Sequence, residues 1–476
     1  MDTKNLERLY QSLTGHAPEW VEELAGASSN RHYFRLKKEG NSLIGVIGTS
    51  IEENRAFLYM DQHFSEKGLP VPKVYAASSD GQCYLQEDLG DKLLFDAIAH
   101  GRDSGSFDAA EQALLEQTIR MLPKFQFKGA ENMDFNKCYP TGEFDLRSIL
   151  WDLNNFKYCF LKAAGLDFQE DHLEDDFQRL ADVLLESNED TFMYHDFQSR
   201  NVILKGGKPY FIDFQGGRKG PYFYDVASFL WQAKANYSSE LREHLLECYL
   251  EELRNYTSVD KNDFRKRLRH FVLFHLLQVL GAYGFRGYFE KKPHFIESVP
   301  YAIGHLRTLL KNDFNEYPYL CNLLQRLTEL ERFKARHSTP TLKVKVVSFA
   351  YPNGIPADDS GNGGGYVFDC RAIHNPGRYD CYKPLTGLDE PVIRFLEADG
   401  EITLFLTHVY ALADAHVIRY IERGLSNLMI CFGCTGGRHR SVYAAQHVAE
   451  YLNRKWGIEI QLEHREQEIT QHFNAR

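Results

Sequence analysis

The sequence predicts an α+β domain built of two lobes, followed by a three-layer α/β domain. The chain has 476 residues, which is too long for one ordinary core, so two domains are expected. Residues 1–334 pass from short strand-like segments into a long series of helical patterns, whereas residues 342–476 alternate strands with helices, as α/β domains do. Between them, the polar, Pro-containing stretch 335–341 predicts a linker.

Composition narrows the class of protein. The chain is 43% hydrophobic, 13% aromatic and 25% charged, the profile of a packed protein. Its net charge of -11 argues against a chain that binds nucleic acid mainly by bulk electrostatics. No apolar run approaches a membrane span and the start has no signal-peptide layout, so we expect a cytoplasmic protein without a membrane partner. The nine Cys show no zinc spacing and predict reduced thiols.

The first lobe is predicted over residues 1–90. After an opening helical segment, a polar turn at 25–31 lies between two alternating segments, which predicts a hairpin. A strand at 41–48, a helix at 52–64 and a strand at 84–90 follow. Residues 91–334 predict a second, helical lobe, because apolar residues recur there every three to four positions.

Three residues of the helical lobe are the candidate catalytic and metal-binding residues. Asp196 and Asn201 are five positions apart in one short loop, and Asp213 ends an apolar strand twelve positions further on. This spacing is typical of phosphoryl transfer. We expect Asp196 to orient and deprotonate the acceptor hydroxyl, and Asn201 and Asp213 to bind Mg²⁺, with ATP as the phosphoryl donor.

The segments 195–201 and 212–228 resemble the signature of the aminoglycoside phosphotransferase superfamily, whose domains have a bilobal fold like that of protein kinases. The Asp213-Phe-Gln motif, with Gly220-Pro and the 224–228 segment, is most similar to AmgK-type anomeric kinases of cell-wall sugar recycling. The resemblance spans about residues 1–330 and implies a sugar or amino-sugar acceptor, N-acetylmuramate or N-acetylglucosamine. Asp225 is expected to be a buried cap that fixes the metal loop, the loop that carries Asp213.

The chain departs from the superfamily at two positions. Gln198 replaces a His, and the third strand of the first lobe lacks the Lys that pairs with phosphates. Without this Lys, another cationic group has to hold the triphosphate of ATP, and Arg31 and Arg35 are the two candidates. In a kinase-like first lobe, the 25–31 turn is expected to cover the nucleotide phosphates; the alternative is an ordinary surface hairpin. The strand at 84–90 is expected to be the hinge that contacts adenine; the alternative is a solvated strand end. The predicted nucleotide-binding residues are Ser28, Ser29, Asn30, Arg31 and Glu87.

The α/β domain has its own candidate site. A strand near 428–432 is followed by a glycine-rich loop with two Arg and one His, and then by a helix from 441, a combination that attracts anions. Several segments of 342–476 look like the C-terminal domain of RapZ adapters, which sense glucosamine-6-phosphate and bind small RNA. This resemblance implies a sugar-phosphate pocket made by Asp369, Arg371, Cys434, Thr435, Gly436, Gly437, Arg438, His439 and Arg440.

Two other functions remain open. Cys434 and Arg440 satisfy the C-x₅-R spacing of thiol phosphatases, so a kinase combined with a phosphatase is one alternative. The other is a nucleotide-binding adapter that presents a small RNA. Residues 341–476 hold 14 Lys and Arg against 16 Asp and Glu, a net charge of -2, and RNA-binding domains are usually basic.

Overall fold

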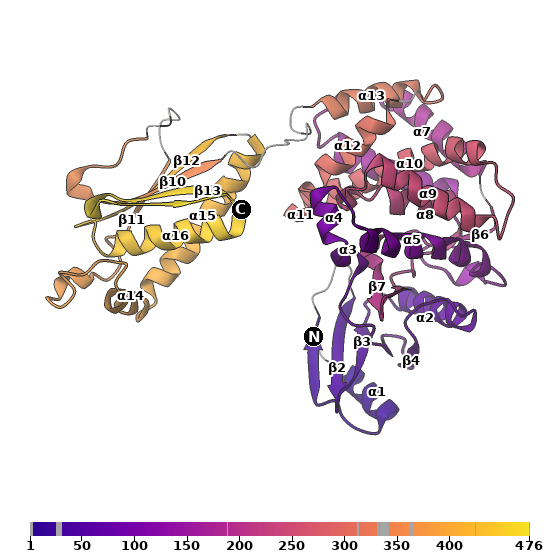
Figure 1. Cartoon of the computed structure of the whole chain (residues 1–476), viewed down its shortest axis with the longest axis horizontal. Coiled ribbons are helices and arrows are strands. Elements are labelled where there is room, and N and C mark those ends of the chain that lie inside the picture. Colours follow the sequence, from indigo (N-terminus) through magenta and orange to yellow (C-terminus); the bar gives the residue numbers. More distant parts are fainter. Residues whose placement is uncertain are drawn as a thin grey trace. The chain divides into compact units, whose positions relative to one another are not determined.

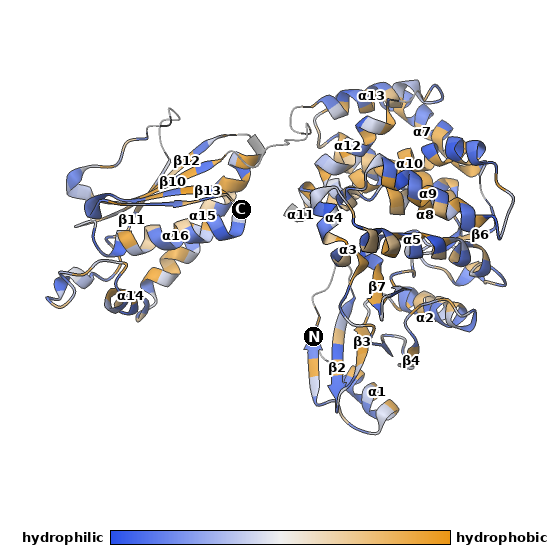
Figure 2. Cartoon of the chain, in the orientation of Figure 1, coloured by the Kyte–Doolittle hydropathy of each residue, from blue (hydrophilic) through white to orange (hydrophobic). Residues whose placement is uncertain are grey.

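The computed structural model describes residues 3–24, 31–187, 189–311, 314–330, 333, 342–358, 360, 365–423 and 425–475. The chain divides into two compact units, Met1–Ala335 and Arg336–Arg476. Each unit has a large hydrophobic core of its own. In Figure 2 the helices of both units carry hydrophobic and hydrophilic residues on different sides. The predicted linker at 335–341 lies outside the described residues.

The first unit begins with a five-stranded antiparallel sheet of order β1-β2-β3-β5-β4 (Figure 1). Successive side chains of a strand point to opposite faces, and Phe34 and Leu36 use one face to pack against Leu6 and Tyr10 of α1. The strand predicted at 41–48 and the helix predicted at 52–64 are confirmed as β3 and α2. The elements are α1 (Lys4–Thr14), β1 (Trp20–Glu23), β2 (His32–Lys38), β3 (Asn41–Ile47), α2 (Ile51–Glu66), β4 (Val74–Ala77) and β5 (Cys83–Glu87).

The strand predicted at 84–90 ends earlier, at Glu87. The Asp88 side chain accepts a hydrogen bond from the Gly90 N–H at 2.9 Å, and Gly90 has a φ of 85°. This is an Asx turn, in which the Asp side chain accepts the backbone N–H two residues further along. It directs the chain out of the sheet and into the helical lobe.

The rest of the first unit is mostly helical, as predicted. Its longest helix, α10, packs against α6, α8 and α12, and all eight residues of α8 are buried. No helix in the described part of the chain is long and apolar enough to cross a membrane. The helices are α3 (Leu94–Ala97), α4 (Ala99–Ser104), α5 (Ala109–Pro123), α6 (Leu146–Asn155), α7 (Glu170–Leu185), α8 (Phe223–Leu230), α9 (Ser239–Leu253), α10 (Lys261–Gly284), α11 (Pro293–Ile296), α12 (Val299–Leu309) and α13 (Pro318–Glu329).

Two short antiparallel ribbons carry the phosphoryl-transfer motif. β6 pairs with β9 and β7 pairs with β8, so the motif residues occupy the connections 194–201 and 212–217. The two loops, which the short β7–β8 hairpin joins, are thereby anchored on paired strands at both ends. The strands are β6 (Thr191–Met193), β7 (Val202–Lys205), β8 (Lys208–Phe211) and β9 (Arg218–Gly220).

The second unit is an α/β domain with a sheet of order β11-β12-β10-β13-β14, in which only β14 is antiparallel. Helices α14, α15 and α16 gather on one face of the sheet (Figure 1), so within the described residues helices cover one face where the predicted three-layer domain has them on both. On the opposite face Val347, Phe349, Met429 and Cys431 form a separate small cluster. The elements are β10 (Lys343–Ala350), β11 (Gly365–Asp369), α14 (Glu390–Glu397), α15 (Glu401–Arg423), β12 (Asn427–Cys434), α16 (Arg440–Trp456), β13 (Glu459–His464) and β14 (Ile469–Phe473).

Candidate functional sites

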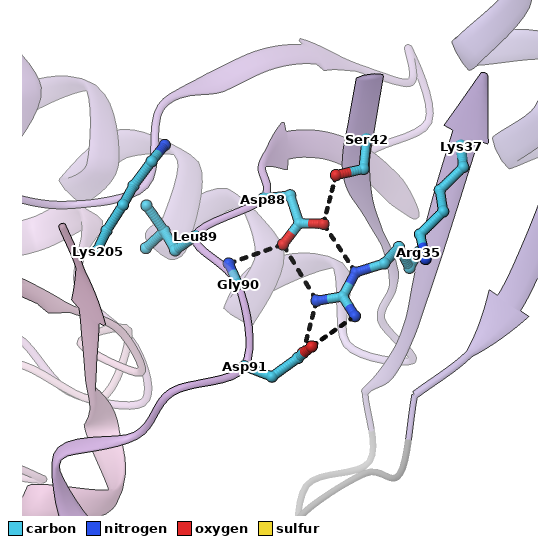
Figure 3. A pocket seen from close by; sticks show the side chains of 8 residues that line it. All are labelled: Arg35, Lys37, Ser42, Asp88, Leu89, Gly90, Asp91 and Lys205. Carbon is cyan, nitrogen blue, oxygen red and sulfur yellow. Dashed lines mark hydrogen bonds and ion pairs between the residues drawn. The ribbon is translucent and has the colours of Figure 1, made fainter. Parts of the chain in front are cut away.

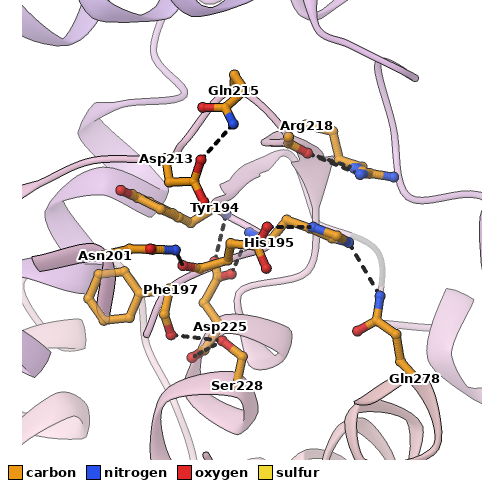
Figure 4. Close-up of polar contacts among 12 residues, drawn as sticks. Tyr194, His195, Phe197, Asn201, Asp213, Gln215, Arg218, Asp225, Ser228 and Gln278 are labelled. Atoms are coloured by element: carbon orange, nitrogen blue, oxygen red, sulfur yellow. Dashed lines mark hydrogen bonds and ion pairs between the residues drawn. The ribbon is translucent and has the colours of Figure 1, made fainter. Parts of the chain in front are cut away.

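Residues 194–201, called the catalytic loop for the role predicted from the sequence, lie beside Asp213 (Figure 4). The hydroxyl of Tyr194, a fully buried residue, donates to the carbonyl of Ile212 at 2.6 Å. The N–H of Ile212 in turn donates to the carbonyl of Asn201 at 3.0 Å. These two contacts bring Asp196, Asn201 and Asp213 together, as the sequence predicts.

Asp225 holds the backbone at the start of this loop. It is fully buried, and its two carboxylate oxygens accept the N–H groups of Tyr194 at 2.8 Å and of His195 at 2.9 Å. His195 has a φ of 76°, a left-handed conformation that costs energy for a residue with a side chain. Burial raises the pKa of Asp225 to about 6, although these hydrogen bonds oppose the shift. The contacts agree with the predicted role of a buried cap.

Asp196 is the exposed carboxylate of the loop. Its side chain is 51% exposed, and its Oδ2 lies 3.8 Å from Nδ1 of His195. Desolvation raises the pKa of Asp196, but the nearby His195 ring and the positive charge of Arg218 outweigh it, so the pKa is held below its usual range. The carboxylate is therefore ionised at neutral pH and able to accept a hydrogen bond from a hydroxyl.

Asn201 and Asp213 offer oxygen atoms beside Asp196. The Asn201 side chain donates from Nδ2 to the backbone carbonyl of Asp196 at 2.9 Å, which leaves its amide oxygen for another partner. The carboxylate of Asp213 accepts a hydrogen bond from Gln215 at 2.7 Å. Burial and the nearby charge of Asp196 raise the pKa of Asp213. Crowded carboxylates next to an amide oxygen fit a divalent cation that prefers oxygen ligands.

Arg31 lies on the side of the first-lobe sheet that faces this loop. It is 4% exposed and forms an ion pair with Glu53 of α2 at 3.2 Å. Phe57, one turn further along α2, stacks on Phe214 with ring centroids 5.0 Å apart, which joins α2 to the loop that carries Asp213. The charge of Arg31 opposes the raised pKa of Asp213 without reversing it. The predicted residues Ser28, Ser29 and Asn30 lie outside the described residues.

Arg35 is held by two carboxylates. It donates from Nε to Asp88 at 2.7 Å and from Nη2 to Asp91 at 2.6 Å. Glu87, the predicted hinge residue, forms an ion pair with Lys205 of β7. A hollow of about 400 Å³ adjoins these contacts (Figure 3), and neither Asp196 nor Asp213 lines it; its residues are Arg35, Lys37, Ser42, Asp88, Leu89, Gly90, Asp91 and Lys205.

Four polar side chains to which the sequence analysis gave no role surround the catalytic loop. Gln278 of α10 donates from Nε2 to Asp152 of α6 at 2.8 Å and lies 3.4 Å from Nε2 of His195. Burial raises the pKa of Asp152 to about 6 and lowers that of His275 to about 3. Arg218 of β9 is buried as well. These residues come from three elements that are distant in sequence, so no spacing pattern joins them.

The predicted anion-binding residues of the second unit gather at one end of its sheet. β12 ends at Cys434 and α16 begins at Arg440. Gly437 between them has a φ of 61°, and a Cβ at this position would lie 2.4 Å from the Glu466 side chain, so the loop requires glycine. The exposed residues of this loop, in front of the 17-residue helix α16, are Thr435, Gly436 and Arg438.

The two arginines beside this loop differ in burial. Arg440 is 3% exposed and donates to the carbonyls of Arg371 at 2.9 Å and Ile373 at 2.8 Å. Its Nε is buried with no hydrogen-bond partner among the described residues. Arg371 is exposed and pairs with Asp369 at 2.7 Å. Asp369 lies opposite Gly433 in the neighbouring strand. Asp369, Arg371 and the loop before α16 therefore lie at the same end of the sheet.

His439 and Cys434 face inward. Nε2 of His439 lies 2.9 Å from the carbonyl of Tyr382, and burial lowers the pKa of this ring, so His439 is neutral at pH 7. Cys434 is 3% exposed, and its sulfur lies 3.1 Å from the hydroxyl of Ser441. The positive charge at the loop therefore comes from the arginines.

Family models match both units. The model of the phosphotransferase enzyme family matches residues 20–261, just over half of the chain. The chain belongs to this family. The model of the RapZ C-terminal domain matches residues 342–468. Both resemblances predicted from the sequence are thus confirmed, and so is the fold class, a kinase-like α+β domain followed by an α/β domain.

The phosphotransferase also resembles individual proteins over part of its length. A nucleotide-binding protein of Paramagnetospirillum magneticum is 39% identical over 142 residues, which are 29% of this chain and 44% of that protein. A nucleotide-binding protein of Fervidobacterium nodosum is 34% identical over 151 residues, 32% of this chain and 51% of that protein. The chain spans about half the length of these curated relatives.

Solved structures similar to the phosphotransferase include two proteins of low sequence identity. One is a putative aminoglycoside phosphotransferase from Ralstonia eutropha, with 15% identity and a TM-score of 0.47, covering 66% of this chain and 99% of that one. The other is the choline kinase LicA from Streptococcus pneumoniae, with 15% identity and a TM-score of 0.46, covering 64% of this chain and 98% of that one.

Proposed function

We propose that the first unit transfers the γ-phosphoryl group of ATP to the anomeric hydroxyl of an N-acetylated amino sugar, N-acetylmuramate or N-acetylglucosamine. The observation that carries the proposal is the meeting of Asp196, Asn201 and Asp213 in two loops tied by Tyr194. Membership of the phosphotransferase family supports the reaction type. The choice of a sugar rests on the resemblance of the 212–228 segment to anomeric sugar kinases.

Each residue has a role in this reaction. Asp196 accepts a hydrogen bond from the acceptor hydroxyl and takes its proton as the bond to phosphorus forms. Asn201 and Asp213 would hold Mg²⁺, which in phosphotransferases neutralises charge on the transferring phosphates. Arg31, kept in place by Glu53, supplies the positive charge that the third strand lacks.

The remaining nucleotide contacts come from the first lobe. Backbone N–H groups and hydroxyls of Ser28, Ser29 and Asn30 would cover the phosphates. Glu87, at the end of β5, would present its backbone to adenine. Both assignments follow from the position of these segments in kinase-like folds.

The test is phosphoryl transfer by the purified full-length protein with ATP and Mg²⁺ and a panel of N-acetylated hexoses and amino sugars. Asp196→Asn is expected to lower kcat by about 10³-fold, within the usual range for loss of a general base. Asp171→Asn, which changes an exposed carboxylate on α7, is the matched control. Phosphorus NMR of the product distinguishes an anomeric phosphate from a 3- or 6-phosphate. Transfer that survives in Asp196→Asn, or transfer to no sugar, would contradict the proposal.

We also propose that the second unit binds a sugar phosphate and thereby regulates the kinase. Exposed backbone in front of α16, the buried Nε of Arg440 and the Arg371 side chain would together hold the phosphate. Titration calorimetry with glucosamine-6-phosphate is expected to show binding that glucosamine lacks and that Arg371→Ala weakens. No binding to the wild-type protein would refute this.

A small-RNA adapter and a Cys434 phosphatase are less well supported. The net charge of 342–476 is close to zero, and Cys434 is buried. Filter binding to small RNA at several salt concentrations tests the first, because phosphate contacts give a steep salt dependence. A phosphatase assay with Cys434→Ser tests the second.

A further inference from the structure

Arg218 is a buried cation with few partners. It is 6% exposed, and within the described residues its Nε and Nη2 donate to a single acceptor, the carbonyl of Gly216, at 3.2 and 3.0 Å (Figure 4). Within the described residues, no carboxylate lies within ion-pair distance of it. An isolated buried charge is costly, and burial lowers the pKa of Arg218. A residue of this kind needs a counter-charge that the folded chain does not supply at contact distance.

The position of Arg218 points to the acceptor side of the site. In the β6–β9 ribbon Arg218 pairs with Met193, which lies two residues before His195. Its positive charge contributes to the lowered pKa of Asp196, and the charge of Asp152 in turn acts on Arg218. Arg218 therefore lies close to both Asp152 and Asp196.

The backbone around Arg218 leaves it little freedom to move away. A Cβ on Gly217 would lie 2.2 Å from the ring of Phe192, which is fully buried. The chain is therefore packed against the core, and three residue pairs with β6 fix the register of β9. A guanidinium has five N–H donors, and the contacts to Gly216 use two of them. The others remain for a second acceptor.

We propose that Arg218 binds a carboxylate of the acceptor, so that the enzyme selects an acidic amino sugar over its neutral counterpart. This inference rests on the proposed function of the first unit and assigns a specificity residue to it. A planar guanidinium and a carboxylate form two parallel hydrogen bonds, which give both affinity and orientation. Asp152, held by Gln278, is then free to accept hydrogen bonds from sugar hydroxyls. The transferred phosphoryl group is the other oxyanion that comes near Asp196, and the experiment separates the two sources.

The experiment compares N-acetylmuramate with N-acetylglucosamine. The two share the ring and the acetamido group, and only the first carries a lactyl ether with a carboxylate. We expect the wild-type protein to have the higher kcat/KM for the acid. Arg218→Met is expected to lower the ratio of kcat/KM for the acid to that for the neutral sugar at least tenfold, mainly through KM, and Arg218→Lys to retain part of the ratio. Melting temperatures of both variants show whether they fold.

A second measurement needs no variant. Added salt weakens attraction between charges, so with the wild-type protein the KM for N-acetylmuramate is expected to rise with ionic strength more than the KM for N-acetylglucosamine. A fall in kcat by the same factor for both sugars in Arg218→Met would assign Arg218 to the transferred phosphoryl group and overturn the proposal. Equal kcat/KM for the two sugars in the wild-type protein would overturn it too. If neither sugar is phosphorylated, the proposed function itself is wrong.

Discussion

The carboxyl groups around the catalytic loop differ in pKa because their surroundings differ. The pKa of Asp196 is lowered although desolvation opposes this, since His195 and Arg218 are close, whereas burial raises the pKa of Asp152 and of Asp225 to about 6. The group proposed to take the proton therefore stays ionised in acid, and the groups that position the loop are the first to become protonated. An acid limb of the activity is thus expected from the supporting residues.

The pH dependence of transfer tests this order. As the pH falls through about 6, Asp152 and Asp225 take up protons, because their raised pKa values lie above the ordinary value near 4. We expect kcat/KM to fall below about pH 6, with a slope steeper than one proton gives, and Asp152→Asn to reduce the slope to that of one proton. Initial rates at subsaturating acceptor between about pH 5 and 8 measure both. Activity that persists to about pH 4 would mean that neither carboxyl group limits transfer.

Sequence spacing predicted only part of the catalytic site. Asp196, Asn201 and Asp213 could be found because they occupy two loops joined by one short hairpin, and a fixed spacing survives in the sequence. Gln278 could not be found, since α10 reaches the loop only through helix packing. Arg31 and Arg35 are only four positions apart, so the sequence could not distinguish their roles. Their ion-pair partners are distant in sequence: Arg31 pairs with Glu53 and Arg35 with Asp88.

At the scale of elements, one side chain fixes the connection between the sheet of the first lobe and the helices. Arg35 of β2 binds Asp88 and Asp91, which follow β5 and precede α3. The Arg35 side chain is 10% exposed and that of Asp88 is 9% exposed, whereas Asp91 is at the surface. Most of the stabilisation should therefore come from the Asp88 contact, because exposed ion pairs contribute little.

Replacing Arg35 tests the strength of this connection. Arg35→Met leaves the Asp88 carboxylate without its guanidinium partner, so we expect the free energy of unfolding to fall by about 2 kcal/mol. Lys37→Met is the matched control, since Lys37 is exposed on the same face of β2 and its loss should change stability by less than about 0.5 kcal/mol. Urea unfolding followed by circular dichroism gives both values. Equal effects of the two substitutions would show that Arg35 fixes nothing.

Element prediction was least complete in the second unit. β12 and α16 correspond to the predicted strand and helix, but β13 and β14 were missed. The period-two alternation of Ile460, Leu462 and His464, all fully buried, marks β13. Charged and polar residues alternate with them, so the sequence of β13 resembles that of an exposed segment. The burial of His464 is explained by the pairing of β13 with β10.

At the scale of the molecule, the two units have separate cores. Stability should therefore be a property of each unit, and a ligand should protect only the unit that binds it. The boundary is expected from the change of hydrophobic periodicity near residue 340, because each pattern needs its own core to bury its apolar face. The burial of the residues in each core supports this division.

Calorimetry of the full-length protein tests this independence. We expect two unfolding transitions. A non-hydrolysable ATP analogue with Mg²⁺ should raise the midpoint of one, and glucosamine-6-phosphate that of the other, each by an amount equivalent to about 2.7 kcal/mol at a ligand concentration of 100 times Kd. Arg371→Ala should abolish only the second shift. A single transition that both ligands move together would show that the units unfold as one.

The last hairpin of the chain supports the anion-binding loop. Between β13 and β14, Gln467 donates to the carbonyl of Gly437 at 3.0 Å and Glu466 accepts the N–H of Ala350 at 3.1 Å. In genetic terms, a nonsense codon shortly after Trp456 would remove this support and spare every residue proposed for phosphoryl transfer. Such an allele would separate the two proposed functions: cells carrying it are expected to keep the proposed phosphoryl transfer and to lose the proposed response to sugar phosphate.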